Sequence, residues 1–323
     1  MNRRSFLISS LCATAPCALV PLAARALTGF PSQPLKIIVA TPAGGGSDTA
    51  ARLLAQALAR NLGQPVLVEN RPGGNGVPAV QATLAAPADG HTLLWAMSSM
   101  TSLPLLVRSA PLKSLGELTP VAPVVNVMFG LFVNPRVPAS TVAELSAYLR
   151  ANPDRLSYAT GVLSEYMAAV QYLRAGGLKA LRVPYKGGAQ LMPDLISGEV
   201  QFNFGPLAPA LGHVRSGKLR LLATLPDRVD ALPGVPSLAE AGVATDALPT
   251  WNGLLAPPRT PPEVAARLAQ EVNRALADPA LRGALEAQGL RVTGGVPQQM
   301  GEAIESAAAT WRQFVHDYEI AQE

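Results

Sequence analysis

Cysteine is nearly absent from this chain, and its two copies lie close to the N-terminus. Cys12 and Cys17 both fall within residues 1–26, a segment that we interpret below as a removable leader. The mature chain would then contain no cysteine. This excludes disulfide bonds, thiolate catalysis and cysteine-based metal sites from the mature protein.

An excess of charge and long apolar runs are also missing. The chain has 26 Lys+Arg and 22 Asp+Glu. Removal of the leader also removes Arg3, Arg4 and Arg25, which leaves 23 basic residues, so the mature protein is nearly neutral. No basic cluster interleaved with aromatic residues follows the leader, and we therefore expect no nucleic-acid partner. No apolar run beyond the leader reaches the roughly 18 residues of a membrane-spanning helix.

The sequence also lacks the patterns of common catalytic and cofactor sites. The three histidines, His91, His213 and His316, are far apart, and neither an H-E-x-x-H nor a G-x-S-x-G motif is present. The glycine-rich turn at 42–46 has neither the lysine of a Walker loop nor the glycine spacing of a dinucleotide fingerprint. We therefore predict that the chain is not an enzyme and that it needs no cofactor and no metal.

The first 26 residues have the features of an export signal. Arg3-Arg4 precede Phe6-Leu7, which is a twin-arginine pattern, and a short apolar stretch interrupted by prolines follows. Ala24-Arg25-Ala26 supplies the small-x-small cleavage signal. We predict a signal peptide cleaved near Ala26 and a mature protein in the periplasm.

The most informative stretch that remains is residues 36–58. A short apolar run at 37–40 predicts a buried strand, and a glycine-rich turn at 42–46 leads into a helix predicted over 48–62. A glycine turn at a helix N-terminus presents backbone N–H groups and partial positive charge, which together favour an anion such as a carboxylate. The alternative is a tight strand–helix connection that binds nothing.

Strand-like and helix-like segments alternate along most of the chain. This alternation predicts α/β architecture with parallel sheets flanked by helices. The strands are predicted at 37–40, 66–69, 92–96, 121–125, 130–133, 156–159, 201–204 and 219–225. The helices are predicted at 48–62, 79–86, 142–150, 164–174, 190–196, 208–216, 262–276, 279–287 and 298–318.

Several phrases, taken in order, resemble one known family. The chain reads ENRPGGNG at 69–76, APADGHTLL at 86–94, RVPYKGGAQLMPDLISGEVQ at 182–201, LPGVPSLAEAG at 232–242 and WNGLLAPPRTPPEV at 251–264. Each phrase alone is weak, but their ordered sum is similar to the receptors of tripartite tricarboxylate transporters, also called the Bug family of periplasmic solute-binding proteins. The resemblance covers essentially the whole chain.

The resemblance implies a fold and a function. The expected fold is a two-lobed clamshell of the type II periplasmic-binding kind, in which each lobe is a mostly parallel sheet flanked by helices. Residues 27–130 and 250–323 would form lobe 1, and residues 131–249 would form lobe 2. The expected function is the capture of a small organic carboxylate between the lobes and its delivery, by a monomer, to the subunits of a membrane transporter.

The resemblance, together with the glycine turns, also predicts the ligand-binding residues. On lobe 1 they surround the turn after the first strand and include two serines after the strand at 92–96. On lobe 2 they lie after the predicted strands at 156–159 and 201–204 and in the glycine turn at 185–188. The predicted set is Thr41, Pro42, Ala43, Gly44, Gly45, Ser47, Asp48, Ser98, Ser99, Thr160, Gly161, Ser164, Tyr185, Lys186, Gly187 and Gly205.

Two departures from the family pattern bear on the ligand. Val162, Leu163 and Tyr166 stand where many relatives have small polar residues, and Gly205 stands where relatives commonly carry an aspartate. Apolar residues at these places would favour a bulky or aromatic acid over citrate, unless they pack into the core of the lobe. Two other functions are also compatible with the sequence: a binding protein that presents its ligand to a membrane kinase, and an exported enzyme on the same scaffold.

Overall fold

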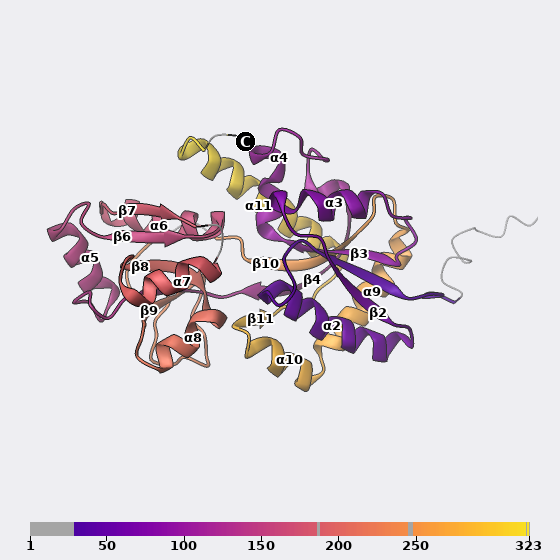
Figure 1. Cartoon of the computed structure of the whole chain (residues 1–323). Coiled ribbons are helices and arrows are strands. Elements are labelled where there is room, and N and C mark those ends of the chain that lie inside the picture. Colours follow the sequence, from indigo (N-terminus) through magenta and orange to yellow (C-terminus); the bar gives the residue numbers. More distant parts are fainter. Residues whose placement is uncertain (1–28, 186–187, 245–247, 321, 323) are drawn as a thin grey trace, which may run out of the picture.

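The computed structural model describes residues 29–185, 188–244, 248–320 and 322, and these residues form two sheets with helices packed on their faces (Figure 1). The larger sheet has six strands in the order β11-β4-β10-β3-β1-β2. Its strands are β1 (Leu35–Val39), β2 (Val66–Asn70), β3 (Thr92–Met97), β4 (Thr119–Val127), β10 (Trp251–Ala256) and β11 (Leu290–Val292). This sheet is the centre of lobe 1.

The second sheet is the centre of lobe 2 and has five strands in the order β7-β6-β8-β5-β9. The chain passes from one sheet to the other between the end of β4 and the start of β5, and it returns between β9 and β10. Gly130 lies inside β5, so the change of sheet falls just before it. A side chain has no room at this position, because an added Cβ would collide with Leu221 and Leu207. The strands are β5 (Phe129–Val133), β6 (Ser157–Thr160), β7 (Leu181–Pro184), β8 (Phe202–Pro206) and β9 (Arg220–Leu225).

Both sheets are mixed, whereas the alternation of strands and helices predicted mostly parallel ones. β1 pairs in parallel with β2 and β3, and β6 pairs in parallel with β7 and β8. β10 runs antiparallel to β3 and β4, and β5 runs antiparallel to β8 and β9. β5 and β10 are the first strands after each passage between lobes. They enter from the edge where the parallel strands end and therefore run in the opposite direction.

Helices cover both faces of each sheet. On lobe 1, α2, α9 and α10 share one apolar core with the sheet, and α3 and α11 pack against the other face. On lobe 2, α5 and α6 cover one face, and α7 and α8 cover the other. The α-helices are α2 (Gly46–Leu62), α3 (Val77–Leu84), α4 (Leu103–Leu106), α5 (Val142–Ala151), α6 (Leu163–Gly176), α7 (Gly188–Ser197), α8 (Leu207–Arg215), α9 (Pro262–Leu276), α10 (Pro279–Glu286) and α11 (Pro297–Asp317). Short 3₁₀ turns occupy Gly74–Gly76, Ser98–Ser102 and Leu115–Glu117.

Sequence signals explain several of these boundaries. α2 ends at Gly63, whose φ of 65° is left-handed and suits glycine. The Thr141 side chain accepts a hydrogen bond from the backbone N–H of Glu144 and so caps α5. The Thr-x-x-Glu spacing at 141–144 is typical of such a cap. Along β1, Leu35, Ile37 and Val39 face the α2 side, whereas Ile38 faces the α3 side. A strand buried on both faces needs this continuous apolar sequence.

α11 connects the two lobes. In Figure 1 it runs from lobe 1 toward lobe 2, and its C-terminal part packs against α6. Phe314 of α11 meets the Tyr166 ring of α6 edge-on at 5.8 Å between ring centroids. One apolar core therefore continues from lobe 1 into lobe 2. Any change in the angle between the lobes must be accommodated at this contact.

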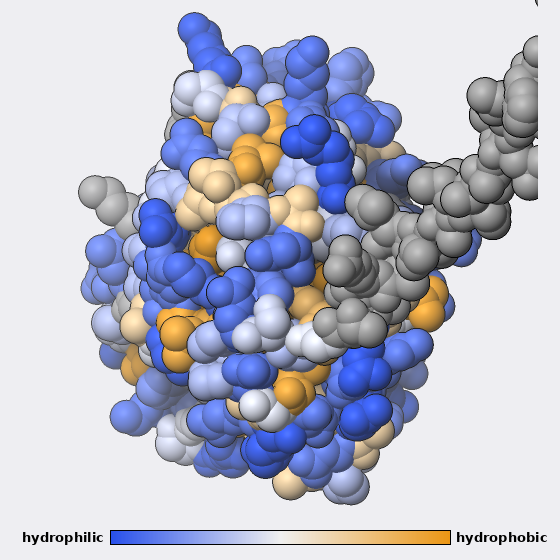
Figure 2. All heavy atoms as spheres, turned by 90° about the vertical axis from the view of Figure 1, so that its right-hand side faces the viewer, coloured by the Kyte–Doolittle hydropathy of each residue, from blue (hydrophilic) through white to orange (hydrophobic). Residues whose placement is uncertain are grey.

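The end of lobe 1 seen in Figure 2 is mainly hydrophilic, with hydrophobic residues scattered in small groups. Isolated apolar residues are normal on a protein surface. Within the described part of the chain, no helix is both long and apolar enough to cross a membrane. Within the same residues, no group of three or more histidine, cysteine, aspartate or glutamate side chains is placed to hold a metal ion.

Candidate functional site

The predicted glycine turn of lobe 1 lies between β1 and α2, as expected. Pro42, Ala43 and Gly44 are exposed, and Gly44 has a φ of 82°, a left-handed conformation that suits glycine. Gly45 is the N-cap of α2 and contributes no side chain to the cap. The first N–H groups of α2 therefore face outward from the turn without an acceptor in the helix. This is the geometry of an anion site.

Asp48 organises this turn from within. Its carboxylate is 2 % exposed and accepts hydrogen bonds from the Gly44 N–H at 2.8 Å, the Asn70 amide at 2.8 Å and the Arg52 guanidinium at 3.0 Å. Burial acts to raise its pKa, but the bonds from Arg52, Gly44 and Asn70 outweigh burial and hold the pKa below its ordinary value. The side chain of Asp48 thus shapes the turn, while the Gly44 N–H is already occupied.

Thr41 and Ser47 flank the same turn. The Thr41 hydroxyl is buried and has no hydrogen-bond partner among the described residues, which is uncommon for a buried polar atom. The Ser47 hydroxyl contacts the Met97 sulfur at 3.4 Å. An unsatisfied hydroxyl beside outward-facing backbone N–H groups is a second indication that an acceptor binds here.

Ser98 and Ser99 follow β3, but the Ser98 side chain has a structural partner. Its hydroxyl donates to the Pro249 carbonyl at 2.8 Å and so ties lobe 1 to the segment that returns from lobe 2. The Ser98 carbonyl accepts from the Trp311 indole of α11, and the Ser99 carbonyl accepts from Ser102. Ser98 therefore joins β3 to the returning segment through its hydroxyl and to α11 through its carbonyl.

The corresponding turn of lobe 2 lies between β6 and α6, and it also holds its own carboxylate. Glu165 is 3 % exposed and accepts hydrogen bonds from the Gly161 and Val162 N–H groups and from the Asn203 side chain. Burial raises its pKa to about 7 despite these three bonds. Ser164, at the start of α6, is buried. Among the described residues, no arginine contributes to Glu165 as Arg52 does to Asp48.

Gly205 and Tyr185 take positions behind this turn. An added Cβ at Gly205 would lie 2.4 Å from the Asn203 amide oxygen and 3.6 Å from a Glu165 oxygen. Glycine therefore leaves room for the Asn203–Glu165 pair. The Tyr185 N–H donates to the Thr160 carbonyl at 2.8 Å, and its hydroxyl donates to Asp194 at 2.7 Å. The predicted residues Lys186 and Gly187 lie outside the described residues.

One cavity of about 540 Å³ has walls from both lobes. Lobe 2 contributes the predicted residues Thr160, Gly161 and Tyr185, and lobe 1 contributes Asn75, Leu106 and the end of the chain. Val162, Leu163 and Tyr166 also line it. These three residues, which differ from the small polar residues of the family pattern, therefore do reach the space between the lobes. None of the lining residues comes from the Thr41–Asp48 turn, which the structure does not bring into this cavity.

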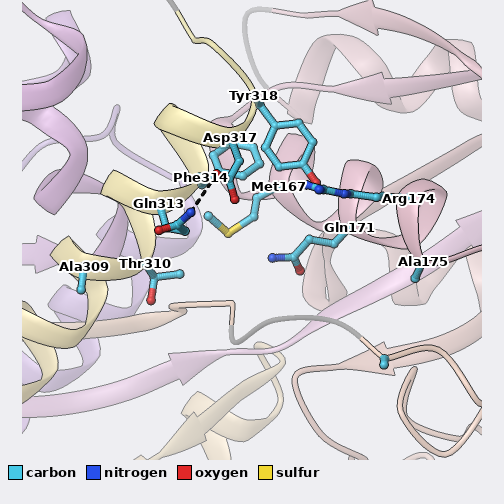
Figure 3. Close-up of a pocket in the computed structure, with 11 residues that line it drawn as sticks. Met167, Gln171, Arg174, Ala175, Ala309, Thr310, Gln313, Phe314, Asp317 and Tyr318 are labelled. Atoms are coloured by element: carbon cyan, nitrogen blue, oxygen red, sulfur yellow. Dashed lines mark hydrogen bonds between the residues drawn. The ribbon is translucent and has the colours of Figure 1, made fainter.

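A larger cavity of about 650 Å³ lies between α6 and α11 (Figure 3). It contains none of the predicted binding residues, although it also lies between the lobes. Figure 3 shows side chains of both helices around one space, with the Gln313–Asp317 hydrogen bond drawn on the α11 side. Its walls include Met167, Gln171 and Arg174 from α6, and Thr310, Gln313, Phe314 and Asp317 from α11. We assign it to the contact between the helices.

Four residues that contact these turns or lie beside them were not predicted from the sequence: Arg52, Asn70, Glu165 and Arg182. Arg52 and Asn70 hold Asp48, and their pairing across β2 and α2 is not visible in the sequence. For Glu165 a signal existed, because Gly44…Asp48 and Gly161…Glu165 have the same spacing of four residues. Arg182 lies in the phrase RVPYKGG, which served only as a family signature.

A two-lobed α/β protein with glycine turns at strand ends and a cavity between its lobes has the architecture of a solute-binding protein. Residues 50–320 match the model of the tripartite tricarboxylate transporter family receptors, TctC, and the chain belongs to this family. It is 35 % identical to protein BugT of Bordetella pertussis over 297 residues, which cover 89 % of this chain and 90 % of BugT. The predicted family is thereby confirmed.

Solved structures agree with this assignment. The structure of Rpa4515 from R. palustris with adipate has a TM-score of 0.81 at 28 % identity, covering 91 % of this chain and 100 % of that one. MatC from Rhodopseudomonas palustris with bound malate has a TM-score of 0.75 at 26 % identity, covering 88 % and 100 %. The two-lobed fold is confirmed. The family and these neighbours are solute-binding proteins, and this chain is a solute-binding receptor and not an enzyme.

Proposed function

We propose that this protein captures a small organic carboxylate between its two lobes in the periplasm and delivers it to a membrane transporter of the tripartite tricarboxylate type. The observation that carries the proposal is the cavity of about 540 Å³ with walls from both lobes. The turn of outward-facing backbone N–H groups at the start of α2, on lobe 1, supports it. Adipate and malate, which the two R. palustris proteins bind, are small dicarboxylates.

Binding would work through lobe closure. The turn around Gly45 and Ser47 would take a carboxylate from lobe 1, with Asp48 holding the turn in shape and Thr41 offering its unpaired hydroxyl. The residues around Thr160 would meet the ligand from lobe 2. A ligand that touches both lobes binds the closed state better and shifts the population toward it. A monomer with lobes 27–130 plus 250–323 and 131–249 suffices for this mechanism, and Lys186 would contact the ligand or a bound water.

A thermal-shift screen of the mature protein against a panel of organic acids tests the function. A ligand at 100 times its dissociation constant should stabilise the folded protein by about 2.7 kcal/mol, because it binds only the folded state. Matched amines and neutral amides of the same carbon skeleton serve as controls, and they should give no shift. Stabilisation by the amines or amides, with none by the acids, would overturn the proposal.

Export by the twin-arginine route can be tested separately. Replacing Arg3 and Arg4 by lysine should leave the precursor in the cytoplasm, because this route reads the arginine pair ahead of the apolar stretch. Fractionation with immunodetection measures the result, and Arg25→Lys is the control because it lies beyond the apolar stretch. Normal periplasmic yield of the double variant would contradict the route.

A further inference from the structure

The turn of lobe 2 is poorly suited to bind an anion through its backbone. The N–H groups of Gly161 and Val162 already donate to the Glu165 carboxylate. When ionised, this carboxylate also offsets the partial positive charge at the start of α6. A ligand carboxylate placed at this turn would meet an occupied site and a like charge. If lobe 2 recognises an anionic group, another residue must do so.

Arg182 lies in the same cavity and has the required chemistry. Its guanidinium carbon stands 3.8 Å from the centroid of the Tyr166 ring, and its Nε donates to the Thr160 hydroxyl at 3.0 Å. A guanidinium has five N–H donors, and this hydrogen bond uses one of them. Within the described part of the chain, no aspartate or glutamate forms an ion pair with Arg182. The aromatic face and the hydroxyl together fix the plane of the guanidinium.

The remaining walls of the cavity are of a different kind. Val162, Leu163 and Leu106 present apolar surface, and Val162 is 51 % exposed. The only other charged side chain among the lining residues is Glu319, near the end of the chain on the lobe 1 side. The cavity therefore combines apolar side chains around one oriented cation with a carboxylate and polar side chains such as Asn75 and Thr160. An apolar wall alone would favour a hydrophobic monocarboxylate, but the cation changes this expectation.

We propose that Arg182 binds a second anionic group of the ligand, so that the protein selects organic dianions with a short apolar spacer over monoanions of the same length. This inference rests on the proposed carboxylate-binding function. The turn of lobe 1 does not line this cavity in the structure, so closure of the lobes must bring the turn to it. In the closed state the first carboxylate binds at that turn, the spacer lies against Val162 and Leu163, and the second carboxylate reaches the guanidinium. A planar guanidinium held on an aromatic ring binds a carboxylate through two parallel hydrogen bonds.

Matched ligand pairs provide the test. Titration calorimetry with the wild-type protein compares succinate, glutarate and adipate with butyrate, pentanoate and hexanoate. For at least one pair, the dicarboxylate should bind about 10- to 100-fold more tightly, which is the usual worth of a hydrogen bond to a charged group. Arg182→Met keeps an unbranched apolar side chain but removes the guanidinium and its charge. It should abolish this preference while leaving monocarboxylate affinity within about twofold.

Two control variants separate specificity from structure. Arg155→Met removes another exposed arginine of lobe 2, in the loop before β6 and far from Thr160, and should keep the preference. Lys218→Met removes an exposed cation of lobe 2 that lies before β9 and does not line the cavity, and it should also keep the preference. Equal loss of both ligand series in Arg182→Met would show that Arg182 only supports the lobe, and would overturn the inference.

The outcome also distinguishes this inference from the function on which it rests. If the wild-type protein binds acids of both series equally well, the inference is overturned and the carboxylate function stands. If the preference for dicarboxylates survives in Arg182→Met, a different residue reads the second group, and the inference is again overturned. If no acid of either series or of the wider panel binds, the proposed function fails and the inference fails with it.

Discussion

The stability of Glu165→Gln is expected to stay constant between pH 5 and pH 8 as far as this position is concerned, whereas the wild-type free energy of unfolding should fall by roughly 2–3 kcal/mol over that range. Burial raises the pKa of Glu165 from 4.5 to about 7 in the folded protein. A tenfold difference in proton affinity corresponds to about 1.4 kcal/mol, so this rise corresponds to about 3 kcal/mol. A glutamine keeps an oxygen to accept from Gly161 but carries no titrating proton.

The sign follows from the direction of the pKa change. Below pH 4.5 the carboxyl group is protonated in both the folded and the unfolded chain, and its contribution to stability is fully present. Between pH 4.5 and about 7, the folded protein holds a proton that the unfolded chain has released, so stability falls as pH rises. Above about pH 7 both states are ionised, and the loss is complete.

Urea denaturation at pH 5, 6, 7 and 8 measures this difference, provided that the transition of lobe 2 is followed. Tyr185→Phe is not a suitable control because that hydroxyl bonds Asp194. Glu199→Gln is suitable, because Glu199 is an exposed carboxyl group of the same lobe. The wild type and Glu199→Gln should show the same decline. An equal decline in Glu165→Gln would contradict the assignment of the titrating group to Glu165.

The elements that the sequence predicts best are the apolar strands and the amphipathic helices. All eight predicted strands and all nine predicted helices correspond to observed elements with small differences at the ends. The strands β7, β10 and β11 were missed for identifiable reasons. β7 carries Arg182 and Pro184 at an exposed sheet edge, β11 has three residues, and β10 begins with Trp251-Asn252-Gly253, which reads as a turn.

The partners of the site residues are less predictable than the turns themselves. Glycines between a strand and a helix indicate a turn and outward N–H groups, because local backbone geometry determines both. Whether those N–H groups are free depends on side chains that fold back onto them. At Gly44 and Gly161 an acidic residue four positions later does so. The partners of Asp48 come from two elements, with the neutralising Arg52 on α2 and the hydrogen-bonding Asn70 on β2. The sequence shows the spacing but not the direction of the side chain.

Gly45→Asp is expected to weaken ligand binding by about 100-fold, or about 3 kcal/mol, without unfolding the protein. Gly45 is the N-cap of α2, with φ −73° and ψ 164°, an extended conformation open to any residue. An added Cβ would lie 3.3 Å from the Pro42 carbonyl, which a small shift of the turn can relieve. Aspartate is also a favourable N-cap, because its carboxylate accepts from the first N–H groups of the helix. The variant should therefore fold at least as well as the wild type.

The loss of affinity follows from the same hydrogen bonds. The aspartate would occupy the N–H groups proposed to bind the ligand, and it would place a like charge beside a ligand carboxylate in a closed cleft, where an unpaired charge is costly. Gly45→Asn has the same shape and capping ability without the charge, so it should lose only the part of the affinity that comes from the occupied N–H groups and keep the part that Gly45→Asp loses to like-charge repulsion. Calorimetry with the panel acid that gives the largest thermal shift measures all three proteins. Because capping stabilises α2 while blocking its N-terminus, stability and affinity should move in opposite directions in Gly45→Asp. Near-native affinity in that folded variant would show that the ligand does not bind at this turn.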